Sequence, residues 1–186
     1  MRIISGIYKG KKLNFPKSIK TRPLRDLVKE SIFNLIENSN KFKFKMSGAK
    51  VLDLFSGSGS FGLECISRGA KKVVFVENNH NTLKVLERNV SELKSELQTN
   101  IIKRNCFDYF NSKNDFKEKF DIIFLDPPFK EIKLNNLIDQ IKNRDLLNKN
   151  GIIITHRHKR DNLDLSNKLN IIDERSYGIS KIIIGI

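Results

Sequence analysis

The sequence has 186 residues, of which 39% are apolar and 30% charged, a balance that excludes disordered, collagen-like and disulfide-scaffold proteins. This length fits one domain with a modest extension, and no apolar run reaches the roughly 18 residues that span a bilayer. The first residues, MRIISGIYKGKK, lack the apolar stretch of a signal peptide, and Cys65 and Cys106 lack CxxC spacing. We therefore expect a cytoplasmic protein without disulfides or a zinc site.

The formal net charge of +14 is concentrated at the start of the chain. Residues 1–50 hold 13 Lys or Arg residues against three acidic residues, so they carry most of the excess positive charge. Clustered cations attract a polyanion such as nucleic acid, because binding releases its counterions. A basic arm that is merely solvated is the alternative explanation of this charge.

Two elements are expected in the basic segment. Residues 2–13 alternate in hydrophobicity, with Gly6 and Gly10 at turn points, and this pattern predicts a short hairpin. From Pro23 onward apolar residues recur at helical spacing as far as residues 38–40, which predicts a helix of about four turns. We expect residues 1–45 to form a basic extension that binds nucleic acid and residues 46–186 to form the main domain.

From residue 51 onward, short apolar runs alternate with polar stretches of helical period. The apolar runs are residues 51–55, 73–76, 101–102, 122–125 and 152–155. Such alternation predicts an α/β fold in which helices cover both faces of a parallel sheet. Residues 169–173 and 180–186 have no helix between them, so an antiparallel hairpin is expected to end a sheet of seven strands.

A glycine-rich turn follows the first of these runs, in VLDLFSGSGSFG at residues 51–62. Gly57 and Gly59 fit the pattern G-x-G-x-x-G, and Glu77 follows Gly57 by 20 residues, where a carboxylate can accept hydrogen bonds from ribose hydroxyls. A dinucleotide and S-adenosylmethionine both fit this pattern. Asp53 favours S-adenosylmethionine, because its carboxylate would attract a cationic ligand and repel a pyrophosphate.

A second motif, DIIFLDPPF at residues 121–129, predicts a buried strand that ends in the rigid turn Asp126-Pro127-Pro128-Phe129. Open α/β sheets bind ligands at the carboxyl ends of their strands. The Asp126 carboxylate and the Pro127 carbonyl could bind both N–H groups of a planar amine, and Phe129 could stack on its ring. The turn therefore predicts methyl transfer to such an amine, with orientation as the main source of acceleration.

This tetrapeptide resembles the signature of amino-directed, S-adenosylmethionine-dependent methyltransferases. Over nearly the whole chain the sequence is similar to the RsmD-type family, which methylates guanine N2 in bacterial 16S ribosomal RNA. The shared segments are RIISGIYKGKKL, Thr21-Arg22-Pro23, the helix with Lys29-Glu30 and Ile32-Phe33-Asn34, and FSGSGSFGLECISRGA at residues 55–70. The N-terminal segments best distinguish this family from DNA and protein methylases, since those enzymes share the glycine loop and DPPF.

The resemblance implies a Rossmann-like class I methyltransferase that uses S-adenosylmethionine and acts on 16S rRNA, free or in an assembling small ribosomal subunit. We expect a bacterial monomer that binds neither metal nor membrane. The expected catalytic residues are Asp126, Pro127, Pro128 and Phe129. The expected cofactor-binding residues are Asp53, Ser56, Gly57, Gly59, Glu77, Asn78, Asn105, Cys106 and Asp126. The expected RNA-binding residues are Arg2, Lys9, Lys11, Lys12, Arg22, Arg25 and Lys29.

Three residues depart from the family pattern. Leu24 stands where the family usually has Thr, Leu27 where a basic residue is common, and His156 where the strand usually ends in an acid. His156 and His158 also form an H-x-H pattern, but the adjacent basic residues would repel a metal ion. The alternative function is a DNA adenine-N6 methylase or another amino-directed nucleic-acid methyltransferase. A DNA adenine-N6 methylase normally needs a larger target-recognition domain than this chain offers.

Overall fold

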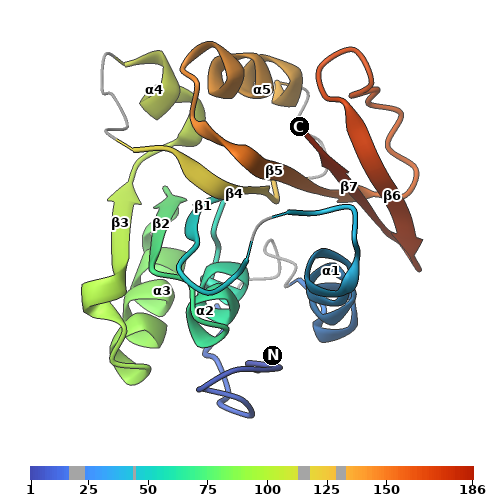
Figure 1. The fold of residues 1–186 in the computed structure, drawn as a ribbon. Coiled ribbons are helices and arrows are strands. Elements are labelled where there is room, and N and C mark those ends of the chain that lie inside the picture. The colour runs from blue at the N-terminus through green and yellow to red at the C-terminus, as the bar shows by residue number, and fades with distance from the viewer. Residues whose placement is uncertain (17–23, 44, 113–117, 129–132) are drawn as a thin grey trace.

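The computed structural model describes residues 1–16, 24–43, 45–112, 118–128 and 133–186. A seven-stranded sheet lies between helices on its two faces, and its strand order is β3-β2-β1-β4-β5-β7-β6 (Figure 1). The strands are β1 (Lys50–Leu54), β2 (Lys72–Glu77), β3 (Thr99–Lys103), β4 (Phe120–Leu125), β5 (Leu147–His158), β6 (Ile171–Tyr177) and β7 (Ser180–Gly185). The helices are α1 (Asp26–Asn38), α2 (Ser60–Ser67), α3 (His80–Glu92), α4 (Cys106–Asn111) and α5 (Leu134–Asn143), with a short 3-10 turn, η1 (Glu96–Gln98).

The first five strands are parallel, and β7 runs antiparallel between β5 and β6. This arrangement confirms the predicted mostly parallel sheet with a closing hairpin. The fifth strand begins at Leu147, five residues before the apolar run that predicts it, because its first part pairs with β4 across a register shift. No helix of the described residues is long and apolar enough to cross a membrane.

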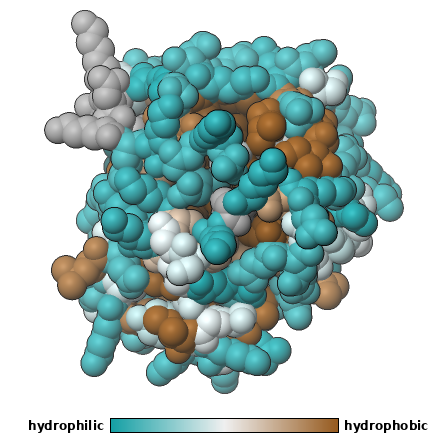
Figure 2. Space-filling model, in the orientation of Figure 1, coloured by the Kyte–Doolittle hydropathy of each residue, from teal (hydrophilic) through white to brown (hydrophobic). Residues whose placement is uncertain are grey.

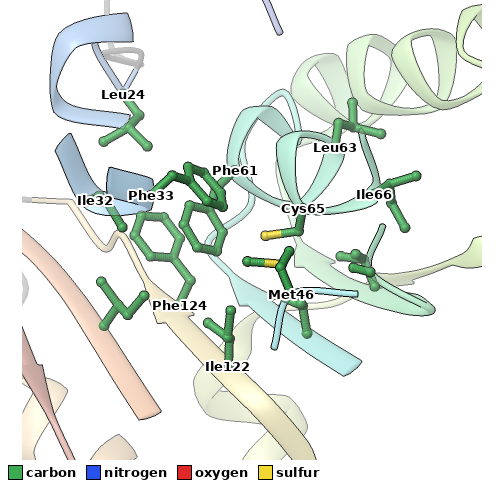
Figure 3. Packing of buried hydrophobic residues seen from close by; sticks show 14 of the residues in the cluster. Leu24, Ile32, Phe33, Met46, Phe61, Leu63, Cys65, Ile66, Ile122 and Phe124 are labelled. Atoms are coloured by element: carbon green, nitrogen blue, oxygen red, sulfur yellow. The ribbon is translucent and has the colours of Figure 1, made fainter. Parts of the chain in front are cut away.

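Apolar side chains fill both faces of the sheet, as parallel strands covered on two sides require. One core joins β1 to α1, α2 and α3, and the other joins β1 to α4 and α5. In the first core the ring of Phe61 lies 5.2 Å from that of Phe33 and 3.9 Å from that of Phe124, measured between centroids (Figure 3). This stack fixes α1 and α2 against β4. Hydrophilic side chains cover most of the face seen in Figure 2.

The N-terminal segment forms the predicted hairpin in a short version. Arg2 and Lys12 make an antiparallel bridge, and the Ile3 amide donates a hydrogen bond to the Lys11 carbonyl at 2.9 Å. Ile3 and Leu13 are buried in the same core as β1 and α1. The boundary expected at residue 45 stays a prediction, and the segments on its two sides share one hydrophobic core.

A buried carboxylate joins this hairpin to α1 and α2. The fully buried side chain of Glu64, on α2, accepts hydrogen bonds from the amides of Ile4 at 2.7 Å and Ser5 at 2.9 Å. It also accepts one from Arg68 Nε at 2.9 Å, and it lies 3.5 Å from the Lys29 ammonium on α1. Lys29 in turn donates to the Arg2 carbonyl at 2.7 Å. The Glu64 carboxylate therefore contacts polar groups from the hairpin, from α1 and from α2 itself.

The position of Lys29 corrects one expectation from the sequence. Its side chain has no exposed surface, and burial lowers the pKa of Lys29 while Glu64 opposes that shift. A buried ammonium cannot reach a phosphate on RNA. The sequence shows that Lys29 is one of the basic residues of the extension. It does not show that the side of α1 that carries Lys29 faces Glu64.

Replacement of Glu64 by Gln is expected to destabilise the protein by about 3–5 kcal/mol, because Lys29 and Arg68 lose their shared buried counterion. The measurement is the free energy of unfolding in urea. Glu87→Gln is the matched control, since it removes the same charge from an ion pair with Lys103 in which both side chains are exposed. Equal losses of stability in the two variants would contradict the role of Glu64.

Candidate active site

A cavity of about 480 Å³ lies at the carboxyl ends of β1, β2 and β4. It is lined by strand ends, the glycine loop, the proline turn and the N-terminal segment: Phe15, Pro16, Leu24, Asp53, Phe55, Ser56, Gly57, Ser58, Ser60, Phe61, Glu77, Asn78, Asn79, Thr82, Phe124, Asp126, Pro127, Pro128 and His156. The structure thus brings together most of the expected catalytic and cofactor-binding residues. Phe129 and Arg22 lie outside the described residues.

Glu77, the last residue of β2, holds the glycine loop in place. Its Oε2 accepts a hydrogen bond from the Gly57 amide at 2.9 Å. Its Oε1 accepts from the amides of Asn78 at 2.9 Å and Asn79 at 2.8 Å. A carboxylate offers about four acceptor positions, so Glu77 can accept one more hydrogen bond, through Oε2. That position is available to a hydroxyl group of a ligand in the cavity.

Asp53 lies at the bottom of the cavity with only 1% of its surface exposed. Its Oδ2 accepts a hydrogen bond from the Gly62 amide in the first turn of α2, at 3.0 Å. Burial raises the pKa of Asp53 well above its usual value, and the carboxylates of Asp126 and Glu77 raise it further. A positive charge in the cavity would oppose this shift and favour the ionised carboxylate.

The glycines of the loop have separate tasks. Gly57, with a φ of +58°, lines the cavity. Gly59, with a φ of +80°, precedes α2, and a Cβ atom there would lie 2.4 Å from Leu86 Cδ1. The missing side chain of Gly59 therefore makes room for α3, and the expected contact of Gly59 with the cofactor stays a prediction. Ser56 ties the ends of β1 and β2, with its hydroxyl 2.8 Å from the Asp53 carbonyl and 3.0 Å from that of Val76.

Asn105 and Cys106 are not among the residues that line this cavity, and their expected position beside the adenine of the cofactor stays a prediction. Asn105 caps α4, and its side chain accepts a hydrogen bond from the Phe107 amide at 2.9 Å. Cys106, the first residue of α4, is buried in the core, and this burial raises the pKa of its thiol to about 12. Both residues fix the start of α4.

Asp126 directly follows β4 and keeps 21% of its side chain exposed. Its Oδ1 lies 2.8 Å from Nδ1 of His156, and Nε2 of His156 lies 2.9 Å from Oγ of Ser180. Local sequence patterns do not reveal this chain of contacts, because it depends on the order β4-β5-β7. Across the described ranges, no three His, Cys, Asp or Glu residues form a group that could hold a metal ion.

The N-terminal segment forms one wall of the cavity, which the sequence pattern does not predict. Phe15 and Pro16 line the cavity. The fully buried amide of Asn89, on α3, accepts a hydrogen bond from the Asn14 amide at 2.8 Å and donates to the Ser58 carbonyl at 2.9 Å. One side chain thus holds the N-terminal segment beside the glycine loop.

Other lining residues that the sequence pattern does not identify are apolar or belong to a helix cap. Leu24, Phe61 and Phe124 are core residues by pattern, and only the fold shows that they border the cavity. Asn79 is recognisable as an N-cap, since it precedes the helical pattern of α3, and its Oδ1 accepts a hydrogen bond from the Thr82 amide at 3.0 Å.

Five expected RNA-binding residues are exposed: Arg2, Lys9, Lys11, Lys12 and Arg25.

A family model described as "Conserved hypothetical protein 95" matches residues 1–186. The chain belongs to this family. YlbH of Bacillus subtilis is 31% identical to this chain, over 99% of it and 97% of its own length. Ribosomal RNA small subunit methyltransferase D of Haemophilus influenzae is 32% identical, over 96% of this chain and 90% of its own. These matches confirm the resemblance to the RsmD-type family.

Solved structures of similar proteins share the whole fold. The Escherichia coli protein yhhF superposes on 99% of this chain and 96% of its own, with a TM-score of 0.83 at 25% identity. The similarity therefore includes the N-terminal extension as well as the seven-stranded sheet.

The raised pKa of Asp53 predicts how stability depends on pH. The folded state holds the Asp53 proton more tightly than the unfolded state, so stability is full below the usual Asp pKa and falls as the pH rises through the folded value. Asp53→Asn should flatten this fall in ligand-free protein. Melting temperatures measured between pH 4 and pH 9 check this, and a parallel pH dependence of variant and wild type would contradict it.

Proposed function

We propose that the protein transfers a methyl group from S-adenosylmethionine to the exocyclic N2 of a guanine in 16S rRNA of the small ribosomal subunit. The observation that carries this proposal is that Glu77, Asp53 and the Asp126-Pro127-Pro128 turn border one cavity. Membership of the family supports the reaction, and the name of the Haemophilus influenzae relative supports the class of RNA.

The residues of the cavity fit this cofactor. Glu77 can accept one more hydrogen bond, as a ribose hydroxyl requires, and the Asp53 and Glu77 carboxylates favour a cationic ligand over a pyrophosphate. S-Adenosylmethionine would supply an electrophilic methyl group on a positively charged sulfur. Asn79 and Thr82 border the same part of the cavity and offer further polar contacts.

The proline turn fits a planar amine. Asp126 Oδ2 takes no hydrogen bond from the described residues, so it can accept one from an amine N–H, and the Pro127 carbonyl can accept a second. With both protons held, the nitrogen lone pair would be directed at the methyl group that the cofactor would supply, so that the new N–C bond would replace the methyl–sulfur bond. The methylated nitrogen would then lose a proton, for which the Asp126 carboxylate is an acceptor. Leu24, Phe61 and Phe124 border the cavity with apolar surface and limit the access of water.

The exposed basic residues of the N-terminal hairpin support an RNA substrate. Lys9, Lys11 and Lys12 lie exposed in the segment that continues into Phe15 and Pro16 at the cavity. Phosphate contacts on this hairpin would hold the RNA next to the cavity, while the cavity itself receives the guanine after it leaves its stack.

Replacement of Asp126 by Ala is expected to lower methyl transfer by about 100-fold or more, because the substrate amine loses the acceptor that orients it. Affinity for S-adenosylmethionine, measured by calorimetry, should stay near that of the wild type. The rate is measured as tritium transferred to ribosomal RNA from cells that lack the enzyme.

Nucleoside analysis of the labelled RNA identifies the modified base. The proposal expects N2-methylguanosine from 16S rRNA. Labelled N6-methyladenosine, label that enters DNA instead of RNA, or an Asp126→Ala variant with more than half the wild-type rate would refute it. Glu87→Gln serves as the control for a charge change outside the cavity.

Neutralisation of Lys9, Lys11 and Lys12 together by Gln is expected to weaken RNA binding and flatten its dependence on salt. For every phosphate that the variant no longer neutralises, the slope of log affinity against log salt falls by about 0.7 to 0.9. Substitution is preferred to deletion, because Ile3 and Leu13 of this hairpin belong to the core. An unchanged slope, measured by filter binding, would show that these residues only solvate the surface.

A further inference from the structure

We propose that His156 is a positioning residue for this reaction, which holds the Asp126 carboxylate so that its Oδ2 faces the substrate amine. The inference rests on the proposed function, because it assigns a task within the same site. It starts from the contact between His156 Nδ1 and Asp126 Oδ1, which are 2.8 Å apart, at a cavity that both residues line.

Of the two neutral tautomers of the ring, its hydrogen-bonding partners favour one. An ionised carboxylate only accepts hydrogen bonds, so Nδ1 carries the proton that it donates to Asp126. Nε2 then accepts from the Ser180 hydroxyl, 2.9 Å away, because a hydroxyl can donate as well as accept. The two contacts select one tautomer, and in this tautomer His156 donates toward the catalytic turn.

Burial restricts the ring further. His156 keeps 6% of its surface exposed and Ser180 keeps 5%, so neither side chain can exchange its partner for bulk water at little cost. The three residues come from the end of β4, from β5 and from β7, which are neighbours in the sheet. His156 therefore links the Asp126 carboxylate to the antiparallel part of the sheet and limits its rotation.

This rigidity matters because the terminal torsion of an Asp side chain is broad and offers little resistance to rotation. A carboxylate that rotates would present its acceptor lone pairs to the amine in many directions. With Oδ1 engaged by His156, Oδ2 is the oxygen that can accept a hydrogen bond from a ligand in the cavity. The rate of methyl transfer depends on how the amine is oriented, and a misplacement of about 1 Å can lower it by roughly 100-fold. The task assigned to His156 is orientation, and it touches no reacting atom itself.

The test uses two amides that replace different nitrogen atoms of the ring. In His156→Asn the amide nitrogen is bonded to Cγ, as Nδ1 is, and can still donate to Asp126. In His156→Gln it lies one bond further from the backbone, near the position of Nε2, and reaches Ser180 instead. Both variants bring a neutral amide of similar polarity to the same buried place, so each controls for the other.

Methyl transfer should stay within about tenfold of the wild type in His156→Asn and fall by roughly 100-fold in His156→Gln, with the loss in kcat and little change in KM. Affinity for S-adenosylmethionine and the melting temperature are measured for both. Equal kcat values in the two variants, whether high or low, would overturn the positioning role. His158→Asn, a change of the same kind two residues along β5, should leave kcat unchanged.

The Asp126→Ala variant separates this inference from the function on which it rests. If Asp126→Ala is inactive but the Asn and Gln variants of His156 have equal kcat values, the positioning role is wrong and the methyltransferase function stands. If Asp126→Ala keeps most of the wild-type rate, the proposed function of the turn fails, and the task assigned to His156 fails with it.

Discussion

The site depends on the place of β1 in the sheet, with β2 on one side and β4 on the other. Parallel pairing aligns Asp53 with Phe75 of β2 and with Phe124 of β4, so the three strands end at one level. The glycine loop follows β1, Glu77 ends β2, and Asp126 follows β4. Since helices cover both faces of the sheet, the carboxyl edge is where these groups can meet a ligand. A different strand order would separate the two motifs that the chemistry needs together.

Buried polar groups then attach the N-terminal extension to this framework. Glu64 accepts hydrogen bonds from the amides of Ile4 and Ser5. The side chain of Asn89 forms hydrogen bonds with both Asn14 and Ser58. A hairpin this short buries too little apolar surface to fold alone, and these contacts give it partners on α2 and α3. The extension thereby becomes a wall of the cavity. An RNA held by the hairpin would lie next to the groups proposed to transfer the methyl group.

The sequence predicts the sheet and the two motifs well, because hydrophobic periodicity and turn residues are local properties. The runs at residues 51–55 and 122–125 correspond to β1 and β4, and Asp53, Glu77 and Asp126 meet at the cavity as expected. Contacts across the fold could not be predicted in this way. The burial of Lys29, the packing of Gly59 against Leu86 and the contact of His156 with Asp126 all depend on which elements become neighbours.

The contacts of the N-terminal hairpin also constrain the order in which the chain can fold during synthesis. The Ile4 amide finds its partner 60 residues later in the sequence, and the Asn14 amide 75 residues later. The hairpin leaves the ribosome before α2 and α3, so its final partners do not yet exist when it emerges. Sequence-distant contacts form late, because the intervening chain must first be ordered. Although the hairpin is made before α2 and α3, it can reach its folded position only after them, and the same delay applies to the burial of Ile3 and Leu13 in the core.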